Sequence, residues 1–67
     1  MTEMQKNILN FITAFQREHG YSPTLREIGD DVGLSSASSV QYQVHQLAAK
    51  GFIRIREGKQ RAIQVLQ

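Results

Sequence analysis

The sequence predicts a mainly α domain of the α+β class, in which three helices are followed by a two-stranded antiparallel β-hairpin. Three observations predict this class. Apolar residues recur at helical spacing in three segments, a glycine follows each segment, and the period becomes alternating after Gly51. A chain of 67 residues is enough for one small domain, so we expect a single domain over residues 1–67.

The first helix is expected over residues 2–19. Thr2 and Gln5 fit a capping box, in which each side chain bonds the backbone N–H of the other residue. Four apolar residues then share one stripe at i, i+3, i+4 and i+7: Ile8, Phe11, Ile12 and Phe15. We assign this stripe, with both phenylalanines, to the core. Gly20 is expected to end the helix, because glycine tolerates the left-handed conformation of a C-terminal cap.

A shorter second helix is expected after Pro23, beginning at Thr24 and ending at Gly33. Thr24 and Glu27 fit a second capping box. Three apolar residues form its buried edge: Leu25, Ile28 and Val32. Gly29 in its interior costs helix stability, which is explained if another helix packs closely against it.

A third helix is expected over residues 36–50, although its start, SSASS, has the composition of a flexible linker. Its apolar residues recur at i, i+4, i+7 and i+8, which a linker would not show: Val40, Val44, Leu47 and Ala48. Ser36 is expected to be the N-cap, with its side chain accepting from a free backbone N–H. Lys50 lies in the last turn, where a cation interacts favourably with the helix dipole, and Gly51 closes the helix.

A β-hairpin is expected over residues 52–66. Apolar and basic residues alternate in its first strand: Ile53, Arg54, Ile55 and Arg56. Residues 57–60, EGKQ, are expected to form a glycine-containing turn. The returning strand contains four apolar residues, with the second and third on one face: Ala62, Ile63, Val65 and Leu66. Because an isolated hairpin is marginally stable, we expect it to pack on the helices.

Composition argues against several classes of function. The chain has no cysteine, so it has neither a disulfide framework nor a thiolate metal site. Its two histidines, His19 and His45, fall on different helices without paired acids, so we expect no metal, no cofactor and no enzymatic activity. No apolar run is long enough to span a membrane, and the N-terminus does not resemble a secretory signal. We therefore expect a cytoplasmic protein.

The charge is distributed unevenly along the chain, although the net charge is only +2. Residues 1–33 carry three basic and five acidic side chains, whereas residues 34–67 carry five basic and one acidic. Such an asymmetry is expected where one face meets a polyanion. A solvated basic hairpin without a partner is the plainer alternative.

The short Gly33–Ser35 connection between the second and third helices is typical of a helix-turn-helix. The second helix of such a pair enters the DNA major groove with its N-terminal residues first. Hydrogen-bonding side chains lie opposite the apolar stripe of residues 36–50, and Gln41 among them is suited to adenine. The exposed first two turns of this helix have no Arg or Lys. Phosphate contacts are therefore expected from other basic residues: Arg26, Lys50, Arg54, Arg56, Lys59 and Arg61.

Two stretches, PTLREIGDDVGLSSASSVQYQVHQLAAKGFIRI and RAIQVL, resemble the winged helix-turn-helix DNA-binding domain of LexA-type repressors. The resemblance covers Gln5 to Leu66, and its most specific parts are Pro23 with REIG, the VGL turn, LxxKGFIR and RAI. It implies sequence-specific binding of double-stranded DNA and transcriptional repression, in the SOS response to DNA damage or in a phage or mobile element. The recognition helix would be residues 36–50, in the major groove. The wing would be residues 52–66, on the phosphate backbone or in the minor groove.

The residues and the resemblance together predict a DNA-binding set on the helix-turn-helix and the hairpin: Thr24, Arg26, Ser36, Ser38, Ser39, Gln41, Tyr42, His45, Arg54, Arg56, Lys59 and Arg61. Carried over by position from the family, the serines, Gln41 and Tyr42 would face the major groove. The alternative is a winged-helix module that binds a protein instead of DNA.

The size of the domain bears on its partners. One winged domain of this size should bind a half-site only weakly, so we expect a palindromic operator and pairing of the chain on it as a homodimer, through a missing domain or through weak contacts. LexA-type repressors carry a second, self-cleaving domain with a serine–lysine dyad, and this chain ends before any such domain. We therefore expect a non-enzymatic chain that acts at bacterial or phage DNA, associated with the nucleoid.

Overall fold

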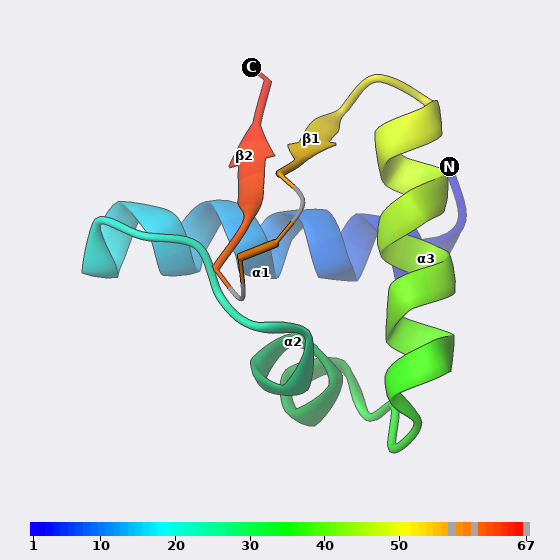
Figure 1. Ribbon diagram of the computed structural model, residues 1–67. Helices are drawn as coiled ribbons and strands as arrows, with labels where there is room; N and C mark the ends of the chain where they lie inside the picture. The colour runs from blue at the N-terminus through cyan, green and yellow to red at the C-terminus, as the bar shows by residue number, and fades with distance from the viewer. Residues whose placement is uncertain (57, 60, 67) are drawn as a thin grey trace.

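The computed structural model describes residues 1–56, 58–59 and 61–66. Its helices are α1 (Glu3–His19), α2 (Leu25–Val32) and α3 (Ala37–Ala49), followed by the strands β1 (Ile53–Ile55) and β2 (Ile63–Val65). The strands pair antiparallel, with Arg54 opposite Gln64. In Figure 1, α1 runs behind the hairpin, α3 stands beside it and α2 lies below. This architecture confirms the predicted winged helix-turn-helix.

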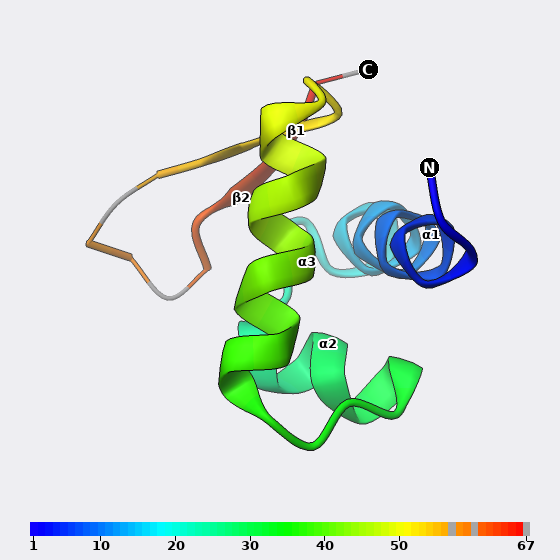
Figure 2. The ribbon, with the colours of Figure 1, turned by 90° about the vertical axis from the view of Figure 1, so that its right-hand side faces the viewer.

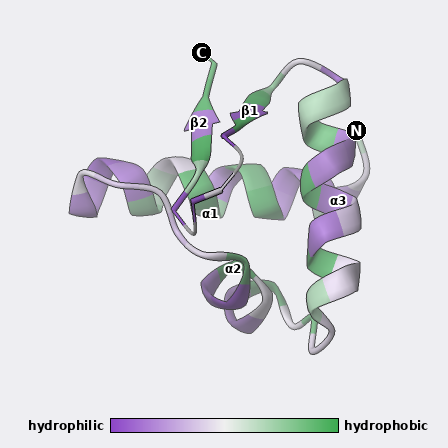
Figure 3. Cartoon of the chain, viewed as in Figure 1, coloured by the Kyte–Doolittle hydropathy of each residue, from purple (hydrophilic) through white to green (hydrophobic). Residues whose placement is uncertain are grey.

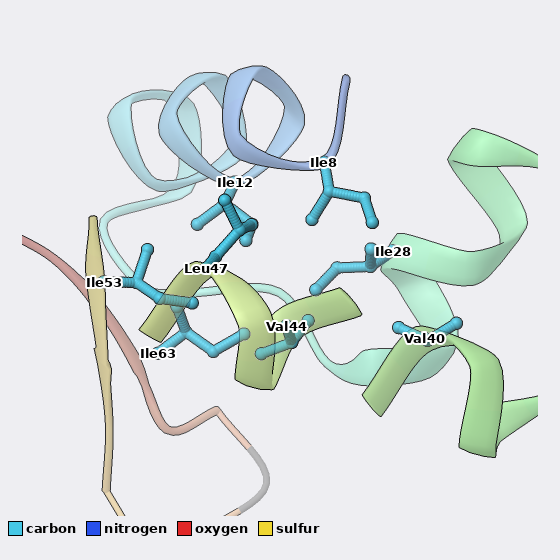
Figure 4. Close-up of a cluster of buried hydrophobic side chains, with 8 residues drawn as sticks. All are labelled: Ile8, Ile12, Ile28, Val40, Val44, Leu47, Ile53 and Ile63. Carbon is cyan, nitrogen blue, oxygen red and sulfur yellow. The ribbon is translucent and has the colours of Figure 1, made fainter. Parts of the chain in front are cut away.

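One hydrophobic core joins all three helices and both strands. Eight aliphatic side chains form it: Ile8, Ile12, Ile28, Val40, Val44, Leu47, Ile53 and Ile63. Figure 4 shows these side chains pointing toward one another from the five elements. Burial of this apolar surface is the main favourable term in folding, as expected for a chain without cysteine. The core holds α3 by one face, so its other face is free to contact a partner.

Hydropathy follows this arrangement along the chain. Figure 3 shows α1 hydrophobic through its middle and hydrophilic at its C-terminal end, where it leaves the core. Among the described residues, no helix combines the length and the hydrophobicity that a membrane span needs.

Helices α1 and α2 begin with the predicted capping boxes. The Gln5 N–H donates to Thr2 Oγ1 at 3.1 Å, and the Thr2 N–H donates to Gln5 Oε1 at 3.3 Å. In α2 the Glu27 N–H donates to Thr24 Oγ1 at 3.1 Å, and the Thr24 N–H donates to Glu27 Oε1 at 2.8 Å. The glycine that follows each of these helices has a φ of 82°. Local sequence therefore determines both ends of α1 and α2.

Two expectations about α2 are confirmed and refined. Gly29 is buried where α2 meets the following turn and Val40 of α3, which explains why a glycine is present. Ile28 is fully buried, whereas Leu25 and Val32 are half-buried and pack against the core from its edge.

The assignment of Phe15 to the core is wrong. Phe15 is half-buried and lies outside the core cluster, whereas Phe11 packs against that cluster from the edge. The Phe15 ring centroid lies 4.2 Å from that of His19 and 5.9 Å from that of Tyr21. By this position α1 has passed the end of the core, so the ring packs against the loop that follows the helix.

The expected capping role of the Ser36 side chain is also wrong. Ser36 occupies the N-cap position of α3, but its side chain makes no hydrogen bond to the first turn. Its hydroxyl instead lies 2.8 Å from the hydroxyl of Ser38. The repeated serines supply a competing partner at i+2, so the first turn of α3 has no side-chain cap.

The hairpin has the predicted alternation. Ile53 and Ile63 are buried, while Arg54 and Gln64 are exposed. Backbone hydrogen bonds extend the ladder beyond both strands, from Arg56 N–H to Ala62 O at 2.8 Å and from Leu66 N–H to Phe52 O at 3.1 Å. The predicted EGKQ turn falls partly on Glu57 and Gln60, which lie outside the described residues.

Candidate nucleic-acid interface

Helix α3 presents a polar face opposite its buried one. Its apolar stripe holds it to the core, and the polar residues between the stripe positions are exposed: Ser38, Ser39, Gln41, Tyr42 and His45. Tyr42 is the most exposed of the large hydrophobic residues that the structure describes, at 61% of its full surface. Such hydrogen-bonding side chains of moderate size, on one side of a helix, are suited to the edges of base pairs.

The start of α3 is available to an anion. Ser36 and Ser38 are bonded to each other, and the first turn has no side-chain acceptor. Backbone N–H groups at a helix start carry a partial positive charge, which favours a phosphate oxygen. Ser39 and whichever of Ser36 and Ser38 does not donate to the other can also donate their hydroxyl hydrogens to such an oxygen atom.

A groove of about 880 Å³ lies between α3, the start of α2 and the hairpin. Six of the predicted DNA-binding residues line it: Thr24, Arg26, Gln41, His45, Arg56 and Lys59. Figure 2 shows β1 and β2 extending to one side of α3, while α1 packs on the other side. Residues that are far apart in the sequence therefore share one concave surface.

The groove is electropositive. Arg26, Arg56 and Lys59 line it, and no carboxylate of the described residues lies within 4.0 Å of their charged groups. Apolar residues of all three elements form its floor: Leu25, Val44, Ile55, Ala62 and Ile63. Cations that form no ion pair with a described carboxylate and lie on a concave wall attract a polyanion, and the effect falls with added salt. Arg54 is exposed on β1 but does not line this groove.

Arg61 occupies a different environment from the other predicted phosphate ligands. Its guanidinium donates to both carboxylate oxygens of Glu27, at 2.9 Å and 3.3 Å, and to the Ser22 carbonyl at 3.0 Å. It also lies over the Tyr21 ring, 4.6 Å from the centroid. Hydrogen bonds from Arg61, and then from the Thr24 N–H, lower the pKa of Glu27. The bond to Glu27 in turn raises the pKa of Arg61.

Gln5 connects the start of α1 to α3. Only 5% of its surface is exposed, and its amide donates to Gln43 Oε1 at 3.1 Å. Lys50 Nζ, at the end of α3, donates to Gln5 Oε1 at 2.7 Å. Lys50, expected to contact phosphate, is thus bonded within the domain. Through Gln43 and Lys50, this network fixes α3 and its C-terminal end against the start of α1.

Sequence reasoning did not assign roles to Gln43 or Ser22, and gave Gln5 and Glu27 only capping roles. Ser22 is buried, and its hydroxyl accepts from the Ile63 N–H at 3.3 Å. Each of these contacts joins residues at least 34 positions apart, so no local pattern indicates it. One pattern in the sequence does point to such a contact: Gln5 is a polar residue three positions before Ile8, on the face of α1 that the apolar stripe buries.

The two histidines lie in different surroundings. His19 lies 3.2 Å from the Glu18 carboxylate and stacks on Phe15, whereas His45 lines the groove. No three His, Asp or Glu side chains of the described residues come together as metal ligands do.

Comparison with known proteins identifies the kind of domain that carries this groove. Residues 1–62 match the family described as the LexA DNA binding domain. The chain belongs to the LexA DNA-binding domain family. This result favours DNA over the protein-interaction alternative, because the matched region contains the whole of α3 and the first strand of the wing.

Curated relatives of this LexA domain are named LexA repressor. The protein from Mycobacteroides abscessus is 49% identical over 65 residues, which are 97% of this chain and 29% of that protein. The proteins from Thermobifida fusca and Mycobacterium tuberculosis are 45% and 46% identical over the same share of the chain, and it covers 26% and 28% of them. The LexA domain described here therefore spans less than a third of the length of these relatives.

Proposed function

We propose that this chain is the DNA-binding part of a LexA-type transcriptional repressor, with α3 in the major groove of an operator and the hairpin on the adjacent backbone or minor groove. One observation carries the proposal. The groove between α3, the start of α2 and the hairpin gathers Arg26, Arg56 and Lys59 around Gln41 and His45. A base-reading helix beside a row of cations is what sequence-specific DNA binding needs.

Within this proposal the two halves of the interface act differently. Ser38, Ser39, Gln41 and Tyr42 read base edges, with Gln41 bonding adenine through its amide. Arg26, Arg56 and Lys59 contact phosphates, together with Thr24 and the start of α3, and Arg54 adds charge on the hairpin. His45 lies between the two groups and contacts either a base or a phosphate.

The proposal extends to partners and to biological role. A single domain of this size covers one half-site, so tight binding needs two copies on a palindromic operator. The names of the relatives support repression of transcription, and we propose the SOS response, or control of a phage or mobile element, as its setting. The chain would then act at DNA in the cytoplasm, by binding alone and without catalysis by residues 1–67.

Selection from a randomised duplex pool tests this function. The chain is used to select bound duplexes, and its affinity is then measured for the selected duplex and for a scrambled duplex at two salt concentrations. We expect the selected duplex to be preferred, and Gln41→Ala and Ser39→Ala to reduce that preference. Lys6→Ala, on the exposed side of α1, is the matched control and should leave it unchanged. Equal binding of both duplexes would contradict base reading, and no binding at low salt would contradict the function as a whole.

A further inference from the structure

We propose that Arg61 is a positioning residue of the interface: with Glu27, it fixes the distance between the wing and the helix-turn-helix, and it does not itself neutralise a phosphate. This inference rests on the proposed function. It changes the role of a residue that the sequence placed among the phosphate ligands, and it gives a binding role to Glu27, an acidic residue that a DNA-binding surface would ordinarily exclude.

None of the residues that Arg61 contacts lines the groove. Its guanidinium is bidentate on Glu27, bonds the Ser22 carbonyl and lies over Tyr21. Both terminal nitrogens of this planar guanidinium already donate to acceptors of the protein, and an aromatic ring lies against its face. Arg61 does not line the groove that Arg26, Arg56 and Lys59 share. Its charge is therefore already compensated before DNA arrives.

One partner of Arg61 is hydrogen-bonded to the opposite wall of the groove. Glu27 Oε1, which accepts from Arg61, also accepts from the Thr24 N–H at 2.8 Å, and Thr24 lines the groove. Arg61 itself directly precedes Ala62 and Ile63, which line the groove from the hairpin. A single carboxylate thus connects the start of α2 to the base of the returning strand.

A second contact beside Arg61 fixes the same strand. The Ile63 N–H donates to the buried hydroxyl of Ser22, and the Ser22 carbonyl accepts from Arg61. Beyond this point the hairpin is held by ladder bonds between its own two strands, such as Arg56 N–H to Ala62 O. The first strand is anchored separately, by Ile53 in the core and by the Phe52 N–H, which donates to the Leu47 carbonyl at 3.1 Å. The position of Arg56 and Lys59 relative to α3 therefore depends on both anchors, of which residues 61–63 are one.

Electrostatics makes this role separable from a phosphate contact. Removing a cation that neutralises one phosphate lowers the slope of log affinity against log salt concentration by about one unit. Removing a negative charge from a DNA-binding face should by itself strengthen binding. If Arg61 and Glu27 act as a positioning pair, removing either one weakens binding. Neither removal then changes the slope of log affinity against log salt concentration.

The test measures the affinity of Glu27→Gln, Arg61→Gln and their double variant for the selected duplex across a salt series. Glutamine at Glu27 keeps an acceptor for the Thr24 N–H, so the capping box survives while the charged pair is lost. We expect each single variant to bind about three- to tenfold more weakly, the size of a coupling within one hydrogen-bond network, and the double variant to lose no more than either. The slope should stay that of the unchanged chain.

Lys59→Gln is the matched control, because it removes an exposed cation of the same hairpin that lines the groove. Its slope should fall by about one unit. Thermal unfolding of every variant confirms that binding is measured on folded protein. If Arg61→Gln does not fold, Glu27→Gln and Arg61→Lys carry the test, since lysine keeps the charge and loses the fork.

Two results would overturn the inference while leaving the proposed function intact. One is tighter or unchanged binding of Glu27→Gln, and the other is a loss of slope in Arg61→Gln equal to that in Lys59→Gln. Absence of binding by the unchanged chain would instead overturn the proposed function, and the positioning role with it.

Discussion

Gly29 lies so close to Leu34 that a Cβ on Gly29 would be 2.6 Å from the Leu34 carbonyl oxygen and 3.0 Å from Val40 Cγ2. The nearer atom belongs to the backbone of the turn between α2 and α3, which cannot rotate away as a flexible side chain can. The Leu34 N–H also donates to the Gly29 carbonyl at 2.9 Å, so the two residues hold the turn against the helix. Glycine at this position thus sets the spacing of the helix-turn-helix.

Gly29→Ala is therefore expected to destabilise the domain, although alanine is the better helix former. We expect the free energy of unfolding to fall by about 1–3 kcal/mol, the usual cost of overpacking. Urea unfolding measures it. Asp30→Ala, at the exposed neighbouring position, should change it by no more than about 0.5 kcal/mol. A Gly29→Ala domain as stable as the unchanged one would contradict the tight contact.

Thr24 and Ser36 should respond differently to replacement by alanine. Thr24→Ala removes an acceptor that the Glu27 N–H uses, so a loss of about 1 kcal/mol is expected in thermal or urea unfolding. Ser36→Ala removes a hydroxyl that caps nothing, and should cost less than about 0.5 kcal/mol. Equal losses in the two variants would show that Ser36 caps α3 after all.

Gln5 should contribute more to the free energy of unfolding than its capping box alone would. Its side chain is nearly buried and bonds Gln43 and Lys50 of α3, so Gln5→Ala leaves those groups without their partner. We expect a loss of about 1–3 kcal/mol in unfolding free energy. A double-mutant cycle with Gln43→Ala should yield a coupling of at least about 0.5 kcal/mol. Lys6→Ala is the exposed control on the same helix.

Acid should weaken the domain partly through Glu27. Its pKa is lowered in the folded state, so the unfolded chain binds the proton more tightly. The stabilisation is present above the ordinary pKa of 4.5 and is lost as the pH falls through the folded value below it. Melting temperatures between pH 6 and pH 3 should therefore fall less steeply in Glu27→Gln than in the unchanged chain. The control Asp31→Asn, at an exposed position, should follow the unchanged chain.

The groove cations should act independently of one another on DNA. Arg26 and Arg56 lie on different elements, and each is expected to neutralise one phosphate. Replacing either by Gln should lower the slope of log affinity against log salt by about 0.9, and the double variant by about twice that. Selected and scrambled duplexes should weaken equally, because phosphates carry no sequence information. A change confined to the selected duplex would indicate that the replaced residue reads a base.

The features that the sequence predicted are those encoded locally. Capping boxes, glycine ends and apolar stripes each lie within a few residues, and they predicted the three helices, the hairpin and most of the core. The stripe rule failed at Phe15, because periodicity continues along a helix after the core beneath it has ended. It failed at Ser36 because a serine has several local partners, and composition does not choose among them.

The candidate site was predicted as a set of residue types but not as an arrangement. Exposure of the polar face of α3 followed from its buried face, and the cations of the hairpin followed from alternation. The sequence did not indicate that Arg61 pairs with Glu27 whereas Arg56 and Lys59 line the groove. The sequence shows four similar basic residues in the hairpin: Arg54, Arg56, Lys59 and Arg61. Only the tertiary contacts with Glu27 and Ser22, which lie in the first half of the chain, distinguish Arg61 from the others.

The separation of α3 into a buried face and an exposed face has a consequence for how such domains diverge. Val40, Val44 and Leu47 hold the helix in place, whereas Ser39, Gln41 and Tyr42 are exposed and add little to the core. In the proposed function, substitutions at these exposed positions alter the preferred operator with little loss of stability. In the proposed function, one scaffold can thereby acquire new target sequences through changes on a single helical surface, while the buried face preserves the architecture.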